Sequence, residues 1–229
     1  MRWATELELL RAGWSAPHRR YHTLEHLAEV LEALDVLVEA DDLSADEARV
    51  ARLAAWYHDL AYDPRSAPGS NEHRSATLAR DHLHRLGVAD QIVDLVEALV
   101  LMTVRHEVDA AVPYAHQRVF DAFHDADLWI LSARRERYAR YAAQVRQEYA
   151  HVPAGAFALG RSAILSDLGG RPAIYRCRRA TRSWEAPART NIAQELAALS
   201  DLSAAPSAGS ARPGATTAGR RSGSPPPQE

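Results

Sequence analysis

The sequence lacks lysine, has a single cysteine and contains no long apolar run. All 27 of its basic residues are arginines, which we attribute to genome composition rather than to chemistry. The lone cysteine, Cys177, excludes an intrachain disulfide framework and fits a reducing cytosol. Because no apolar stretch approaches about 18 residues, we expect no transmembrane helix.

The chain also lacks a large excess of charge of either sign. Its net charge is −3 and its pI is about 6.4, which argues against bulk binding to nucleic-acid polymers or membrane surfaces. The first residues, MRWATELELLRAG, carry charges throughout and are not typical of a secretory signal. These features predict a cytoplasmic protein that binds neither membranes nor nucleic-acid polymers. They leave the oligomeric state open, and a homo-oligomer is compatible with them.

Large apolar residues are nearly absent from the last stretch of the chain. From Ala204 onward it reads AAPSAGSARPGATTAGRRSGSPPPQE, a composition typical of disorder. We therefore expect a disordered tail over 204–229 and one folded domain over 1–203. A chain of that length is expected to bury roughly 70% of the surface that its unfolded form exposes.

Alternating strand patterns and internal repeats are missing too, whereas helical periodicity is widespread. Ser44 and Glu47 form a capping box before one helix, and Gly87 suits the end of another. The pattern predicts an all-α bundle of about seven to nine helices. The expected helices are 26–40, 45–61, 71–87, 90–104, 116–131, 133–149, 157–168 and 188–199, with a loop over 63–70.

Three segments place histidines and aspartates on or beside apolar helix faces: YHTLEH (21–26), WYHDLAYD (56–63) and FHDADLWIL (123–131). Each has an ordinary interpretation when taken singly, as a core histidine or a surface carboxylate. Spacing alone does not define a metal site, because neighbouring residues on a helix point about 100° apart. A buried carboxylate, however, needs a partner or a metal. Three such segments in one small domain favour a divalent metal bound by imidazoles and carboxylates.

The same segments resemble the H…HD…D pattern of the HD superfamily of metal-dependent phosphohydrolases. The likeness is closest to a subgroup of small bacterial predicted HD phosphohydrolases and covers nearly the whole folded part. It implies an HD-domain helical bundle with one or two divalent ions per chain, of Mn, Mg, Zn, Fe, Co or Ni. The ordered blocks that carry it are YHTLEH, WYHDLAYD, SNEHRSA, FHDADLWIL, VRQEY, LGRSAIL and EAPARTN.

Matched position by position, the resemblance implies a metal ligand set of His26, His58, Asp59 and Asp127. Asp127 is preferred over Asp125 because the last aspartate of the HD pattern typically follows a small residue and precedes an apolar one. Asp125 is then an additional ligand or a residue that contacts one.

A more distant likeness concerns His22. Tyr21–His26 is similar to the Y-H-N-x-x-H motif of cyclic-nucleotide phosphodiesterases, with Thr23 in place of Asn. It implies that His22 is the general acid. The alternative is a structural histidine at a helix start.

Further residues are candidates for supporting roles. Glu72 and Asn71 are candidates for positioning water or a second metal, with helix capping as the alternative. His106 is a candidate extra ligand, and His73 is a weaker one. An anionic substrate needs cations, for which the blocks offer Arg146, Arg161 and Arg189. Glu148 and Glu185 are alternative partners of these arginines within the fold.

The leading functional hypothesis is metal-dependent hydrolysis of a phosphate ester in a nucleotide or related small molecule. Metal-activated water would be the nucleophile, with catalytic roles for His22, Asp59 and Glu72. Phosphomonoester and phosphodiester cleavage are not separable from the sequence. Two alternatives come from other classes. One is an HD-fold mixed-valent di-iron oxygenase, which needs additional histidine ligands, and the other is a catalytically silent nucleotide-binding sensor.

Overall fold

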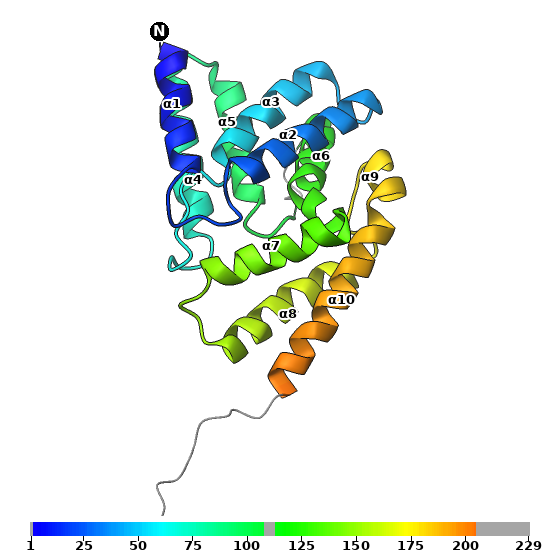
Figure 1. Cartoon of the computed structure of the whole chain (residues 1–229). Coiled ribbons are helices and arrows are strands. Elements are labelled where there is room, and N and C mark those ends of the chain that lie inside the picture. The colour runs from blue at the N-terminus through cyan, green and yellow to red at the C-terminus, as the bar shows by residue number, and fades with distance from the viewer. Residues whose placement is uncertain (1, 108–112, 205–229) are drawn as a thin grey trace, which may run out of the picture.

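The computed structural model describes residues 2–107 and 113–204, and all of its regular elements are helices (Figure 1). The predicted all-α class is confirmed. The elements are α1 (Arg2–Trp14), α2 (Leu24–Glu39), α3 (Ala45–Tyr57), α4 (Ser70–Leu86), α5 (Asp90–Met102), η1 (Tyr114–His116), α6 (Gln117–Asp127), η2 (Leu128–Ser132), α7 (Arg135–Glu148), α8 (Ala154–Gly170), α9 (Arg178–Ser183) and α10 (Glu185–Ala204). The predicted disordered tail lies, from residue 205 on, outside the described residues. Among the described helices, none has the length and apolar character of a membrane span.

The helices pack in two groups that meet along α6 and η2. In the first group α2 packs against α3 and α6, α3 packs against α5, and α5 packs against α4. In the second group α10 runs beside α8 and contacts η2, while α7 also contacts η2 (Figure 1). Residues that form the centre of the core, with almost no exposed surface, include Leu34, Leu83, Leu99, Phe123 and Leu165.

Local signals place several helix ends as the sequence predicts. Ser44 and Glu47 form the capping box that begins α3, and Gly87 ends α4 with a positive φ of 78°. Thr23 is the N-cap of α2, so that His22 lies just before the helix and His26 lies in its first turn. At α4, however, the N-cap is Gly69, and Asn71 lies inside the first turn rather than at the cap.

Two helices end earlier than the periodicity predicts, and both ends carry candidate ligands. The helix expected over 45–61 ends at Tyr57, and residues 58–60 form a turn. The helix expected over 116–131 changes into the 3₁₀ helix η2 directly after Asp127. Both aspartates of the candidate centre therefore lie at the carboxyl ends of helices.

Candidate metal centre

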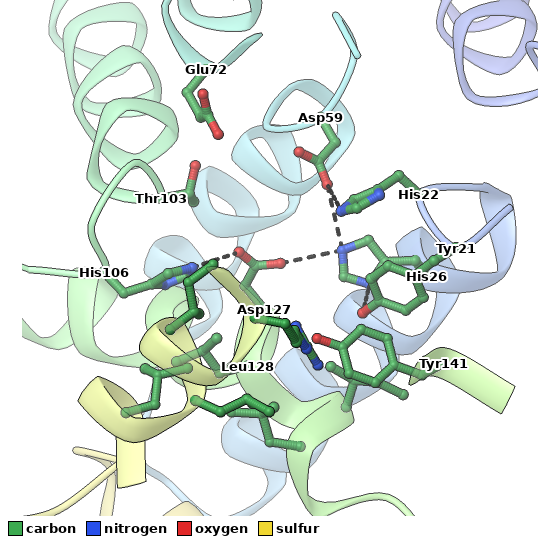
Figure 2. Close-up of a pocket in the computed structure, with 16 residues that line it drawn as sticks. Tyr21, His22, His26, Asp59, Glu72, Thr103, His106, Asp127, Leu128 and Tyr141 are labelled. Atoms are coloured by element: carbon green, nitrogen blue, oxygen red, sulfur yellow. Dashed lines mark hydrogen bonds and ion pairs between the residues drawn. The ribbon is translucent and has the colours of Figure 1, made fainter. Parts of the chain in front are cut away.

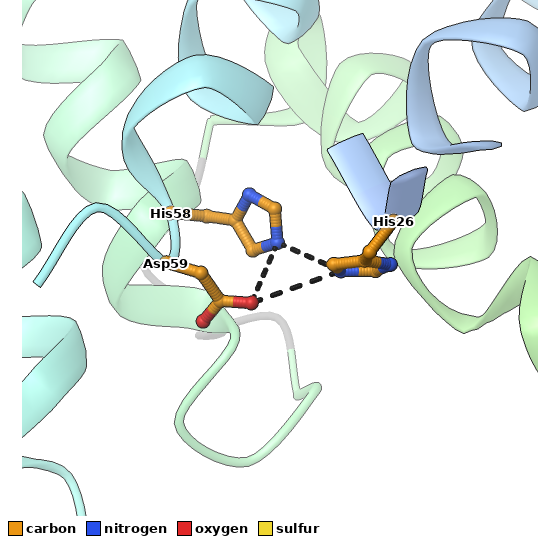
Figure 3. Close-up of side chains that lie close together, drawn as sticks. All are labelled: His26, His58 and Asp59. Carbon is orange, nitrogen blue, oxygen red and sulfur yellow. Dashed lines mark hydrogen bonds and ion pairs between the residues drawn. The ribbon is translucent and has the colours of Figure 1, made fainter. Parts of the chain in front are cut away.

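Four side chains from three helices converge on one point at the end of a cavity. The Nε2 atoms of His26 and His58 are 3.2 Å apart, and Asp59 Oδ2 is 3.7 Å from the first and 3.1 Å from the second (Figure 3). Asp127 Oδ1 lies 3.3 Å from both Nε2 atoms. The structure thus brings together the four residues of the ligand set that the HD resemblance implies.

These spacings fit a bound cation. For nitrogen and oxygen ligands about 2.0–2.2 Å from a metal, neighbouring ligand atoms lie roughly 3–3.6 Å apart. His26, His58 and Asp59 are close enough together to hold a metal ion. Identity is not specified by this set, because imidazole and carboxylate ligands suit several divalent metals.

Hydrogen bonds to Nδ1 of His26 and His58 orient the two rings so that Nε2 of each ring points to the centre. His58 Nδ1 donates to the carbonyl of Ala55 at 2.8 Å, so Nε2 of the neutral ring is a lone pair. His26 Nδ1 is 2.9 Å from the hydroxyl of Tyr21. If both rings are neutral, as metal binding through Nε2 requires, at most one proton is available among the four converging atoms. Histidines that bind metals are typically held in this way through their other nitrogen.

The position of the two carboxylates also requires positive charge nearby. Asp59 follows the end of α3 and Asp127 ends α6, where the helix dipole disfavours a negative group. Burial would raise the pKa of each carboxyl, but the neighbouring histidines, His58 foremost, hold both pKa values well below the usual range. Burial alone would lower the pKa of His58, yet Asp59 and Asp127 raise it well above normal. A cation among these groups would supply the same charge.

His22 lies beside the four converging side chains and is oriented by Glu148 of α7. His22 Nδ1 is 2.7 Å from Glu148 Oε2, while Nε2 is 3.9 Å from Asp59 Oδ2 (Figure 2). Tyr62 donates its hydroxyl to the same Glu148 oxygen and stacks on the His22 ring. Burial would lower the pKa of His22, but Asp59 and Glu148 outweigh it and raise the value. The two carboxylates therefore favour the charged ring more than water does.

Sequence reasoning missed a buried arginine that fixes the backbone around the centre. Arg19 donates to the carbonyls of His22, Asp59 and Leu60 at 2.8–2.9 Å. Its guanidinium lies over the rings of Trp14 and Tyr62. Because carbonyls at a helix end lack helical partners, these bonds explain why the chain turns after α3. In a sequence with 27 basic residues, nothing singled this one out.

The centre opens into a cavity of about 210 Å³. Its polar lining includes His22, His26, Asp59, Asp127 and four further side chains (Figure 2). Those four are Glu72, Thr103, His106 and Arg161. Arg161 forms a bidentate pair with Glu195 through Nε and Nη2, at 2.9 and 3.1 Å. Among the described residues, no acceptor binds its Nη1.

His106 reaches the centre from an unusual backbone conformation. Its φ is +53°, a left-handed value that costs a non-glycine residue roughly 1–2 kcal/mol. Arg176 and Arg171 hold it there by donating to its carbonyl at 2.7 and 3.3 Å. Its Nε2 lies 3.6 Å from Asp127 Oδ2, and burial lowers its pKa. The ring is therefore neutral and directed at one of the candidate ligands.

Several predicted site residues lie elsewhere and serve the fold. Asp125 accepts the backbone N–H groups of Arg176 and Cys177, and Asn71 bonds both backbone groups of Asp63. Arg146 donates to the carbonyls of Tyr149 and Val152. Arg189 pairs with Glu185 and donates to three carbonyls. His73 bonds the carbonyl of Gly69 and is exposed. None of these five lines the cavity.

Comparison of the chain with models of protein families, with curated proteins and with solved structures gives no significant match. Function is therefore inferred from the geometry of the centre and from the sequence motifs that form it.

Proposed function

We propose that this protein is a metal-dependent phosphohydrolase that acts on the phosphate ester of a small molecule. The observation that carries the proposal is the convergence of His26, His58, Asp59 and Asp127 at the end of a cavity that also contains His22. The resemblance to the HD superfamily supports it, since these are the residues that the resemblance selects.

In this proposal the two histidines and two aspartates hold one or two divalent ions. Such ions, when bound, make water a nucleophile near neutral pH and neutralise phosphoryl oxygens. The other residues of the site orient these ligands. Tyr21 and the Ala55 carbonyl orient the two imidazoles, and Arg19 fixes the turn that carries Asp59.

His22 is the proposed general acid for the leaving group. Glu148 binds its Nδ1–H, which directs Nε2–H toward the centre, and Asp59 and Glu148 raise its pKa above the ordinary value for histidine. A positioned histidine typically contributes about 10²- to 10⁴-fold to a rate through proton transfer.

We propose that Arg161 binds the negatively charged phosphoryl group of the substrate. Its bidentate pair with Glu195 holds the guanidinium plane in place and leaves Nη1 for a phosphoryl oxygen. Glu72, which lines the same cavity, is the candidate for orienting water.

The test is a hydrolysis screen with metal analysis of the same sample. Full-length protein incubated with Mn²⁺, Zn²⁺ or Mg²⁺ is expected to release phosphate from activated and unactivated esters, nucleotides included. Asp59→Ala is expected to abolish both turnover and metal uptake. Asp35→Ala, an exposed change on α2, is the matched control and is expected to retain both. Phosphate release by Asp59→Ala at the normal rate would refute the proposal.

One observation favours the oxygenase alternative. His106 supplies a further neutral imidazole next to Asp127, as an additional iron ligand would require. Oxygen consumption by iron-loaded protein, in the absence of phosphate release, would support that alternative over hydrolysis.

A further inference from the structure

The cavity has a second wall that the proposed chemistry does not use. It consists of aliphatic side chains from η2 and α8, namely Leu128, Ile130, Leu131, Ile164, Leu165 and Leu168. Figure 2 shows Leu128 and Tyr141 across Asp127 from Asp59 and Glu72. The cavity is therefore divided into a polar end at the centre and an apolar arm.

The aliphatic wall itself cannot satisfy a polar ligand, and the other cavity-lining side chains on that side include Tyr141 and Arg161. None of its six aliphatic side chains donates or accepts a hydrogen bond. A nucleobase edge or a row of sugar hydroxyls placed there would lose its bonds to water without replacement. A hydrocarbon group, by contrast, gains from leaving water.

The size of the cavity gives a second restriction. Its volume is about 210 Å³. Pockets that enclose drug-sized ligands are larger, about 300–1,000 Å³. A phosphoryl group with a short hydrocarbon fits this space, whereas a nucleoside would have to project past Ile164, which is 56% exposed at the rim of the cavity.

We infer that the substrate is the phosphate ester of a compact apolar alcohol, whose hydrocarbon lies along the η2–α8 wall. This inference rests on the proposed phosphohydrolase function and specifies its substrate class. Hydrolysis transfers the phosphoryl group to water, and the alcohol leaves with the proton that His22 donates. Arg161, which lines the same cavity from α8, would contact the phosphoryl end.

The first test uses a series of alkyl phosphates with metal-loaded, full-length protein. Ethyl, propyl, butyl and pentyl phosphate have similar leaving groups, so differences in kcat/KM report binding of the alkyl chain. We expect kcat/KM to rise about three- to fourfold per methylene until the arm is filled. Glycerol phosphate and AMP are expected to fall below butyl phosphate. A flat series, or a preference for AMP, would overturn the inference.

The second test assigns the effect to the wall. Ile164→Asn places a polar group on a half-exposed residue of the arm, so the fold is expected to tolerate it. In this variant kcat/KM should no longer rise with chain length, so that butyl phosphate loses its advantage over ethyl phosphate. Leu159→Asn is the control, because Leu159 is on the same helix, 70% exposed and outside the cavity. Equal behaviour of the two variants would contradict the inference.

Binding of unreactive phosphonates separates this inference from the proposed hydrolysis. Calorimetry should show butylphosphonate binding more tightly than methylphosphonate, with a more negative heat-capacity change, and Ile164→Asn should remove the difference. If this holds while no ester is hydrolysed, the apolar arm stands and the proposed hydrolysis fails. If esters are hydrolysed but the two phosphonates bind equally, the arm assignment fails alone.

Discussion

Each residue around the centre has a partner that restricts what it can do. Asp59 and Asp127 each contact two or more histidines, and His22 lies between Asp59 and Glu148. Replacing one of these side chains therefore leaves a specific histidine or carboxylate without its partner. Predictions at this scale follow from which group is left.

Replacing His22 tests its role as proton donor. His22→Asn should lower kcat/KM for an alkyl phosphate by about 10²- to 10⁴-fold, because an alkoxide leaving group needs a proton. It should lower kcat/KM for 4-nitrophenyl phosphate much less, because nitrophenolate leaves without one. His84→Asn, on the exposed side of α4, is the control. Equal losses on both esters would mean that His22 acts in some way other than proton donation.

Because of Glu148, the free energy of unfolding is expected to fall at acidic pH. Burial would raise its pKa, but His22 and the backbone N–H groups around it lower the value from 4.5 to about 2. The resulting stabilisation, on the order of 3 kcal/mol, is fully present above the unfolded pKa and is lost as pH falls toward 2. Glu148→Gln should therefore be clearly less stable than wild type in urea at pH 7. The difference between the two should narrow as pH falls from 5 toward 3.

An exposed carboxylate provides the control for this pH dependence. Glu32→Gln on α2 should leave the free energy of unfolding nearly unchanged at every pH. If the difference in free energy of unfolding between Glu148→Gln and wild type stays constant with pH, the variant loses packing and not a charge interaction.

At the residue scale, motif resemblance selected the four side chains that converge and missed the residues that hold them in place. The VRQEY block drew attention to Arg146, which bonds only backbone carbonyls among the described residues, whereas Glu148 two positions later orients His22. Arg19 and Tyr62 were likewise not assigned roles. Such partners are set by contacts between segments far apart in sequence, which no local pattern records.

At the scale of secondary structure, the site lies where two helices, α3 and α6, end. On a continuous helix His58 and Asp59 would point about 100° apart and would not share a face. Because α3 ends at Tyr57, the following turn brings their ligand atoms to 3.1 Å. Periodicity predicted a helix to residue 61, since the apolar residues after Tyr57 continue the pattern. The tertiary bonds of Arg19 override that local preference.

Replacing Arg19 tests the turn as an element. Arg19→Lys keeps the charge but loses the planar fork that reaches three carbonyls. We expect metal affinity to fall about 10- to 100-fold, as is typical when a residue that orients ligands is changed. Arg20→Lys, at a neighbouring exposed residue, should bind metal normally. Isothermal titration with Mn²⁺ measures both, and equal affinities would refute this role.

At the scale of the whole molecule, helical periodicity predicted the all-α class and most helices. It missed α1, whose large apolar residues lie on both faces, with Leu7 and Leu9 exposed and Leu10 and Trp14 buried. It also missed α9, whose six residues are too short for a periodic pattern. The cavity and its apolar arm could not be predicted, because their lining comes from segments far apart in the sequence.

Metal binding should stabilise the whole fold, because the centre joins α2, α3 and α6. A ligand that binds only the folded state adds about 2.7 kcal/mol at a concentration of 100 Kd. Thermal unfolding of wild-type protein should therefore shift to higher temperature with increasing Mn²⁺ or Zn²⁺. Asp59→Ala should show no shift, while Asp35→Ala should shift like wild type. A shift that is the same in all three would place the bound ion elsewhere.

The most direct test of the central claim is the metal content of the protein. Wild-type protein is incubated with Mn²⁺, Zn²⁺ and Mg²⁺, freed of unbound ions and analysed for metal per chain. We predict one or two ions per chain in the wild type and in Asp35→Ala, and loss of at least one ion in Asp59→Ala and in Asp127→Ala. Wild-type protein without metal after all three incubations, or aspartate variants with the full wild-type content, would contradict the assignment of this centre.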